Sequence, residues 1–423
     1  MKKTPIDNMG QTIRIVLLVA LFCLFTNLSA EARSVVYDPQ VKTLQMIVND
    51  DWMSLPVMQL GSDDVLNVSF DELSHTYHRY LYRVERCEAD WTPSEGLFES
   101  DWLSGFSENP IEDYENSLNT TVLYTHYQLQ IPNERCQLKM SGNYRLHIVD
   151  DEDDHEVLCA EFMVVERLMD VGLGVTTNTD VDVNVSHQQV AMTVNYRSLN
   201  VSNPDLQLHT VVMQNGREDT RRLNPKPTFK RHDQMKWEHC RELIFDAGNE
   251  YHKFEMLDLS HATMGVDHIV WDGKAYHVFP FVQAPRRNYL YDEDADGAFL
   301  IRNSDNYDIE RTCDYAWVHF TLSPSEAYAD EVVADGRWAT AEDAANYQLD
   351  YNADTGGYSG AVLLKQGYYN YQFMLRDATG TLRPMPEEGS FFETQNSYQA
   401  MVYYREITGR TWRLVGYQQV ILK

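Results

Sequence analysis

Apolar and polar residues alternate along most of the chain, which is the pattern of β-strands that bury one face. The alternating segments are 66–70, 80–84, 144–148, 158–164, 190–196, 206–213, 243–246, 316–322, 368–375 and 398–404. Amphipathic helical periodicity is almost absent, and Gly, Pro, Asn and Asp separate the segments. The sequence therefore predicts an all-β fold made of tandem immunoglobulin-like or fibronectin-like β-sandwich domains.

The acidic run 150–154 lies between two alternating segments, 144–148 and 158–164. Two strands on either side of a short charged stretch predict a hairpin with a solvated tip. Composition shifts place one domain boundary near residues 166–170 and another near 303–310. We therefore expect a first sandwich over 33–168, a middle sandwich over 169–305 and an early-set-like C-terminal sandwich over 306–423.

The stretch Gln214 to Lys236 is rich in Arg, Lys, Asn and Pro and does not alternate, so it is predicted to be a long loop. It is the only strongly basic stretch in a chain of net charge −29. A chain this acidic repels nucleic acid and anionic membrane surfaces. No nucleic-acid partner is therefore expected. The apolar share of 43% is sufficient to build cores, which excludes a disordered protein.

The N-terminus has the layout of a secretory signal peptide. Lys2, Lys3 and Arg14 precede a short apolar run, and the small residues Ala30 and Ala32 follow it. The run is about half of the ~20 residues that a membrane-spanning helix needs. Residues 1–32 are therefore expected to be removed, which leaves a periplasmic protein of net charge −30, because the segment carries three basic and two acidic side chains. No integral membrane segment is expected.

Five cysteines follow the predicted signal peptide, and an odd number cannot all form disulfides within one chain. None belongs to a C-x-x-C motif and no two show metal-ligand spacing, so neither zinc binding nor thiol redox chemistry is expected. Most are predicted to be buried. Cys136 and Cys159, which flank one hairpin region, are the first choice for a disulfide.

No catalytic constellation is recognisable: there is no G-x-S-x-G motif, no H-E-x-x-H motif and no glycine-rich phosphate loop. We therefore expect no catalytic residues, no cofactor and no enzyme activity. Asp292, Asp294 and Asp296 before Gly297 match the first half of a calcium loop, but the twelfth position is Asn303 rather than Glu. An Asp-Gly turn is the alternative, and it is preferred; no metal site is expected.

Longer blocks carry a family resemblance. They are Tyr82 to Trp91, Gly105-Phe106, Ile111 to Tyr127, Ile131 to Glu134, Ser141 to Tyr144, Phe245 to Phe254, Asp314 to Leu322, Leu364 to Tyr371, Glu388 to Ser390, Thr394 to Tyr398 and Val402 to Arg405. Their order and spacing resemble those of the type IX secretion system plug protein family. His252-Lys253, Gln395 and Asp296-Gly297 depart from its pattern, which affects local turns only.

The resemblance implies a non-catalytic protein, monomeric on its own, at the periplasmic face of the outer membrane. Its implied partner is the outer-membrane translocon barrel, whose periplasmic opening such proteins seal when no client is passing. Trp91, Trp102, Phe106 and Tyr114 could contribute aromatic anchors to that contact, although aromatics beside strands more often close a sandwich core.

A second resemblance covers the C-terminal third. Arg337-Trp338, Tyr351-Asn352, Tyr358 and Leu364 to Phe373 are similar to the early-set sandwich related to glycogen-binding modules. This resemblance implies an alternative function, a periplasmic carbohydrate-binding protein that stacks sugars on an exposed Trp338 and neighbouring tyrosines. Likeness of fold does not carry function with it, so this alternative ranks second.

Overall fold

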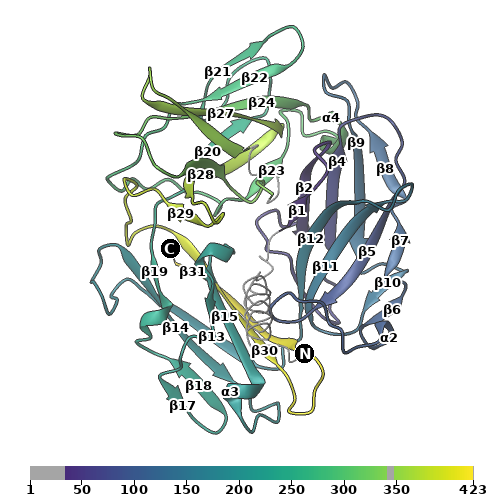
Figure 1. Cartoon of the computed structure of the whole chain (residues 1–423), viewed down its shortest axis with the longest axis vertical. Coiled ribbons are helices and arrows are strands. Elements are labelled where there is room, and N and C mark those ends of the chain that lie inside the picture. Colours follow the sequence, from purple (N-terminus) through teal and green to yellow (C-terminus); the bar gives the residue numbers. More distant parts are fainter. Residues whose placement is uncertain (1–33, 341–346, 423) are drawn as a thin grey trace, which may run out of the picture.

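Figure 1 shows the computed structural model of the chain, which describes residues 34–340 and 347–422. Strands dominate, and the few helices are single turns, so the predicted all-β fold is confirmed. Three hydrophobic cores divide the strands into an N-terminal, a middle and a third sandwich. The predicted signal peptide lies outside the described residues. Within them, no helix is both long and apolar enough to cross a membrane.

The N-terminal sandwich packs two sheets face to face. The first has the order β1-β12-β11-β5-β7 with β3 beside β12, and the second has the order β2-β4-β9-β8. The strands are β1 (Val35–Val36), β2 (Val41–Val48), β3 (Val57–Gln59), β4 (Leu66–Glu72), β5 (Tyr80–Cys87), β7 (Glu108–Pro110), β8 (Asp113–Asn116), β9 (Thr125–Ile131), β11 (Gly142–Asp150) and β12 (Glu156–Val165). The short helix α2 (Glu99–Trp102) leads into a small ribbon of β6 (Leu103–Gly105) and β10 (Cys136–Leu138).

The alternating residues of these strands form the N-terminal core, as their period of two requires. Leu66, Val68 and Phe70 of β4 are fully buried, and the ring of Phe70 stacks on Tyr127 of β9. Strands β11 and β12 form the predicted hairpin around the acidic tip. The sequence therefore predicted both the positions of these strands and which of their side chains face the core.

The middle sandwich packs one sheet, β13-β14-β18-β17 with β19 beside β14, against another, β16-β15-β30-β31. Its strands are β13 (Asp170–Thr176), β14 (His187–Asn195), β15 (Leu208–Gln214), β16 (Arg222–Leu223), β17 (Phe229–Lys230), β18 (Gln234–Trp237), β19 (Ile244–Asp246), β30 (Asn396–Tyr404) and β31 (Arg413–Leu422). Single turns α3 (Pro204–Gln207), η1 (Glu218–Thr220) and η2 (Arg241–Leu243) lie between strands. The predicted loop from Gln214 to Lys236 thus contains short strands, and β18 begins inside it.

The third sandwich is a ten-stranded sheet folded over its own core. Its order is β20-β28-β25-β26-β27-β24-β22-β21, with β23 and β29 beside β28. The strands are β20 (His252–Met256), β21 (Val266–Trp271), β22 (Tyr276–Pro280), β23 (Phe299–Ile301), β24 (Tyr315–Leu322), β25 (Glu331–Asp335), β26 (Gln348–Asn352), β27 (Gly357–Lys365), β28 (Gly367–Arg376) and β29 (Leu382–Pro384). The turn α4 (Ile309–Thr312) precedes β24.

Strand pairing does not follow the serial order of segments expected from the sequence. β30 pairs with β15 over seven residues, from Leu208 opposite Tyr404 to Gln214 opposite Tyr398. β20 pairs with β28, on the other side of the expected boundary near residue 305. The third sandwich is therefore inserted between β19 and β30 of the middle sandwich, and Figure 1 shows the final strands returning to the teal strands of that sandwich.

Candidate functional site: the junctions between the sandwiches

A buried ion pair joins the N-terminal sandwich to the third sandwich. Nζ of Lys365, at the end of β27, lies 2.7 Å from Oδ2 of Asp71 in β4, and both side chains are 1% exposed. The Tyr315 hydroxyl donates to the same oxygen at 2.6 Å, and Nδ1 of His126 lies 2.7 Å from the other carboxylate oxygen. Both oxygens of this buried carboxylate are thus paired, as a charge away from water requires.

The surroundings of the pair favour its charged state. Burial alone would raise the pKa of Asp71, but the Lys365 ammonium and the contact with His126 outweigh burial and hold this pKa below its usual range. Lys365 also donates to the carbonyl oxygen of Glu310 at 2.8 Å, and its ammonium lies 4.1 Å from the centre of the Tyr124 ring.

A second group of hydrogen bonds extends this junction along the loop before β9. The carboxylate of Asp314 accepts the backbone N–H groups of Thr121 and Val122, at 2.6 and 3.1 Å. The Tyr124 hydroxyl donates to the carbonyl oxygen of Cys313 at 2.8 Å. The loop of one sandwich is therefore held on the α4–β24 connection of the other by directional contacts.

A separate junction joins the N-terminal sandwich to the β30–β31 connection of the middle sandwich. Arg86 of β5 is buried and donates to the carbonyl oxygen of Trp412 at 2.6 Å and to the Thr411 hydroxyl at 2.5 Å. Glu88 accepts the backbone N–H of Trp412 at 2.8 Å, and the Tyr403 hydroxyl donates to Asn143 at 2.8 Å. An apolar cluster that includes Val165, Met213 and Leu414 packs beneath these contacts; its further buried members are Ala89, Val211, Met401 and Tyr403.

A cavity of about 500 Å³ lies where the three sandwiches meet. Trp52 and Leu55 line it from the N-terminal sandwich, Arg217 from the middle sandwich and Arg337 from the third. Arg337 donates to the carbonyl oxygen of Met53 at 2.8 Å, which adds a direct contact across the centre. Gly216 of the middle sandwich packs closely against Leu55 of the N-terminal sandwich. A Cβ at position 216 would lie 2.6 Å from the Leu55 side chain, so a larger residue would not fit without a shift.

The four aromatic residues singled out from the sequence fall into two groups. Trp91 and Trp102 are buried, whereas Phe106 is 70% exposed and Tyr114 is also exposed. Phe98, which the sequence reasoning did not single out, is 72% exposed. Phe98 and Phe106 flank the α2–β6 segment, so this end of the N-terminal sandwich presents aromatic side chains to solvent.

The aspartates of the possible calcium loop do not form one site. Asp292 pairs with Nζ of Lys253 at 2.5 Å, whereas Asp294 accepts backbone N–H groups of Tyr251 and Asp296. Burial raises the pKa of Asp294 to about 7. Asp296 and Gly297 both have positive φ, and Ala298 N–H donates to the carbonyl oxygen of Ala295, which is the Asp-Gly turn preferred from the sequence.

Trp338 is not available as a sugar platform. It is 7% exposed, its ring stacks on Phe320, and its Nε1 donates to the carbonyl oxygen of Asn370 at 2.8 Å. The indole therefore belongs to the core of the third sandwich. The carbohydrate-binding alternative therefore loses Trp338, and of the tyrosines named with it Tyr358 is buried and Tyr351 is exposed.

The five described cysteines are all buried and all free, which corrects the suggested Cys136–Cys159 disulfide. Cys136 lies in the β6–β10 ribbon, and Cys159 faces His147 across the β11–β12 hairpin, so different elements hold the two thiols. Burial raises the pKa of Cys87, Cys136 and Cys313 to about 12. These three thiols stay protonated at neutral pH, which makes them poor nucleophiles.

The junction residues were not singled out from the sequence. The only signal was that Asp71 and Glu72 end an otherwise alternating strand with two adjacent acidic residues, and both are buried. The first five residues of β4 alternate between buried and half-buried, whereas its last three are all buried. The alternation stops there because this end of the strand is also covered by the third sandwich.

The family model for the first domain of type 9 secretion system plug proteins matches residues 41–166, which are the N-terminal sandwich. The N-terminal sandwich is a first domain of the type 9 secretion system plug protein family. The match covers most of the side chains that the N-terminal sandwich contributes to the junctions, including Asp71, Arg86 and His126. This family is a structural component of secretion and is not a known enzyme family.

The crystal structure of a hypothetical protein from Parabacteroides merdae is similar to this chain over most of its length. It shares 36% of residues, covers 93% of this chain and 100% of its own, and superposes with a TM-score of 0.89. C-terminal domains of antigen I/II-family proteins from Streptococcus pyogenes and Streptococcus agalactiae share only 8%. Each covers 90% of this chain and 99% or 98% of its own, with TM-scores of 0.16 and 0.14, too low to indicate a common fold. No matching relative was found among curated proteins.

Proposed function

We propose that this chain is a non-catalytic stopper that binds the periplasmic opening of the outer-membrane type IX translocon barrel and seals it when no client is present. Family membership, established over the N-terminal sandwich, carries the proposal. A barrel wide enough to pass folded proteins leaves an aqueous lumen unless something fills or caps it. The proposed location is the periplasm, at the inner face of the outer membrane, after removal of residues 1–32.

The junctions suit a stopper because they resist relative motion of the sandwiches. Domains joined by small polar interfaces are expected to move against each other. Here the buried Asp71–Lys365 pair and the buried Arg86 contacts would have to be exposed or left unpaired during such motion. A small shift would leave each charge without its partner before water could reach it. An uncompensated buried charge costs about 3 to 5 kcal/mol, so small relative motions at these junctions are disfavoured.

The exposed aromatic side chains beside α2 are the proposed contact with the barrel. Phe98 and Phe106 lie in the family-matched sandwich, and large aromatic side chains are the residues that most often anchor protein interfaces. The surrounding chain is strongly acidic, so a partner rim with polar or basic groups would complement it. On its own, the chain is proposed to be monomeric.

Antibiotic entry in deletion strains tests the sealing role. A strain that lacks this chain should still assemble the barrel and should admit large hydrophilic antibiotics that the intact outer membrane excludes. The sensitivity should disappear when the barrel is deleted as well, because the barrel is the route of entry. If sensitivity stayed equally high in the double deletion, the leak would come from general envelope damage and the sealing role would be wrong.

Co-purification tests the contact itself. The variant Phe98→Ser/Phe106→Ser should reduce recovery of the barrel with this chain by about tenfold or more, as expected for interface anchors. Leu290→Ser is the matched control, since Leu290 is at least as exposed but lies in the third sandwich. Equal recovery with the double variant and the wild type would place the contact elsewhere on the surface.

A further inference from the structure

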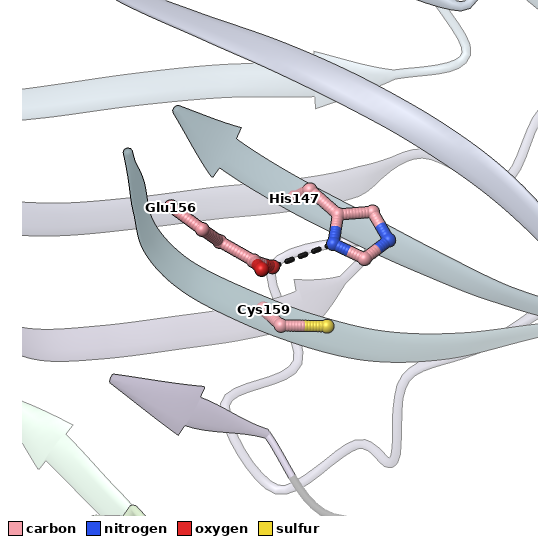
Figure 2. Close-up of side chains that lie close together, drawn as sticks. All are labelled: His147, Glu156 and Cys159. Atoms are coloured by element: carbon pink, nitrogen blue, oxygen red, sulfur yellow. Dashed lines mark hydrogen bonds and ion pairs between the residues drawn. The ribbon is translucent and has the colours of Figure 1, made fainter. Parts of the chain in front are cut away.

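The side chains of His147, Glu156 and Cys159 converge on one face of the β11–β12 hairpin, as Figure 2 shows. Nδ1 of His147 lies 2.6 Å from Oε1 of Glu156, and one donor atom from each of the three residues lies within 4.8 Å of the others. Among the described residues, this is the only group of three or more His, Cys, Asp or Glu side chains with that property.

A β-bulge creates this convergence. His147 is directly opposite Cys159, but beyond Ile148 the register shifts and Val149 is opposite Glu156. Without the shift, positions 156 and 159 would point to opposite faces of the sheet, because they are an odd number of residues apart. A bulge re-aims a side chain in this way, and here it turns Glu156 to the side of His147 and Cys159.

The donor set is that of a zinc site. Imidazole nitrogen, thiolate sulfur and carboxylate oxygen are the three protein ligand types of Zn²⁺, and three of them with a water complete a tetrahedron. With bonds of about 2.0 to 2.3 Å the donors of such a site lie roughly 3.5 Å apart, so the present spacing needs only small side-chain rotations. Cys159 is buried, whereas His147 and Glu156 are partly exposed and give an ion a route from solvent.

A metal-bound histidine usually has a carboxylate, carbonyl or water beside its other ring nitrogen, and Glu85 is the carboxylate in that place beside His147. Its Oε2 lies 3.6 Å from Nε2 of His147, on the side of the ring opposite Glu156. This separation is longer than a hydrogen bond, but a negative charge on this side favours a proton on Nε2 and leaves Nδ1 free to bind a metal. The neighbouring cations are already paired, Arg145 with Glu161 and Arg83 with Glu108 and Asp154.

We propose that His147, Glu156 and Cys159 bind one Zn²⁺ ion, with Glu85 as the positioning residue for the imidazole. Binding releases the Cys159 thiol proton and any second proton on His147, and the thiolate and carboxylate then balance the charge of the ion. The ion links β11 to β12 next to the acidic tip of their hairpin. This site is independent of the sealing role, and its test does not involve the translocon.

The test uses the tag-free chain from residue 33 onward, stripped with a chelator and titrated with zinc chloride. Elemental analysis after gel filtration should give one zinc per wild-type chain. Cys159→Ser and His147→Gln should each weaken binding by at least about 100-fold, and Glu85→Gln by about 10- to 100-fold. His155→Gln is the matched control, because His155 lies at the exposed tip of the same hairpin and is not in the cluster, and it should bind like the wild type.

Cobalt substitution identifies the ligands directly. The wild-type chain with Co²⁺ should show a sulfur-to-cobalt charge-transfer band that Cys159→Ser lacks, while circular dichroism shows that both remain folded. Two results would overturn the proposal. One is that the wild-type chain retains no more zinc than the Cys159→Ser/His147→Gln variant, and the other is that the cobalt spectrum is unchanged by Cys159→Ser.

Discussion

The ammonium group of Lys365 lies 2.7 Å from the carboxylate of Asp71, although the two residues are 294 positions apart and belong to different sandwiches. Two fully buried charges are stable only because each compensates the other. The pair therefore makes the N-terminal sandwich and the third sandwich dependent on each other for stability.

Lys365→Met leaves Asp71 as an uncompensated buried charge, so it should lower the free energy of unfolding by about 3 to 5 kcal/mol. Asp71→Asn combined with Lys365→Met removes both charges and should recover at least half of this loss. Urea denaturation followed by fluorescence measures both effects. Arg79→Met, which removes the exposed ion pair with Asp151, is the control and should change stability by less than about 1 kcal/mol. A loss for Lys365→Met no larger than the control would contradict the role of the pair.

Because of Asp294, we expect the free energy of unfolding to fall as the pH rises from about 4 to 7. Burial raises its pKa in the folded protein to about 7, so the folded state binds the proton more tightly than the unfolded state. A raised pKa gives stability that is fully present below the unfolded value of about 3.9 and is lost as the pH rises through 7. Asp294→Asn should remove about 2 to 3 kcal/mol of the difference in stability between pH 5 and pH 7.5. An unchanged pH profile in this variant would show that Asp294 is not protonated in the folded protein.

Trp338→Ala should destabilise the protein by about 3 to 5 kcal/mol, because it leaves a cavity beside Phe320 and an unpaired carbonyl oxygen on Asn370. Trp317→Ala is the matched control, since Trp317 is exposed on the same sandwich and its removal should cost less than about 1 kcal/mol. Thermal unfolding measures both variants. Neither the wild type nor either variant should be retained on immobilised polysaccharide, and retention that depends on Trp338 would revive the carbohydrate-binding alternative.

Thiol labelling should find all five cysteines of the mature chain reduced. In the folded, chelator-treated protein their labelling should be slow because every one is buried. After denaturation without a reductant, mass spectrometry should show five labels per chain. A population with three labels and a peptide linking Cys136 to Cys159 would contradict the structure.

Alternation predicted the strands of the N-terminal sandwich well because each has one face in a core and one toward solvent. It failed for strands such as β21, where five of six residues are partly or fully exposed. Such a strand buries neither face, so its sequence does not alternate between apolar and polar residues. Alternation also could not give the partners of β30. All nine residues of β30 are buried, and its pairing with β15 depends on residues almost two hundred positions earlier.

The candidate sites could not be predicted from the sequence, because their residues are brought together by contacts that local spacing does not determine. Asp71 and Lys365 meet only because two sandwiches dock, and local spacing contains no information about docking. His147, Glu156 and Cys159 meet because of a register shift of one residue, which no spacing rule for metal ligands anticipates. The Asp-Gly turn was predictable because its two positive φ angles are set by the turn residues themselves.

The return of β30 and β31 to the middle sandwich also sets an order of events as the chain is made. The N-terminal sandwich has all its strands once residue 165 has emerged, so it can close early. Strand β15 must wait for almost two hundred further residues before β30 covers its edge, and an unpaired edge invites association with other chains. Strands β30 and β31 thus complete the middle sandwich only after the third sandwich has all its strands. Removal of the residues from 394 onward would therefore damage the middle sandwich and leave every strand of the third sandwich in place.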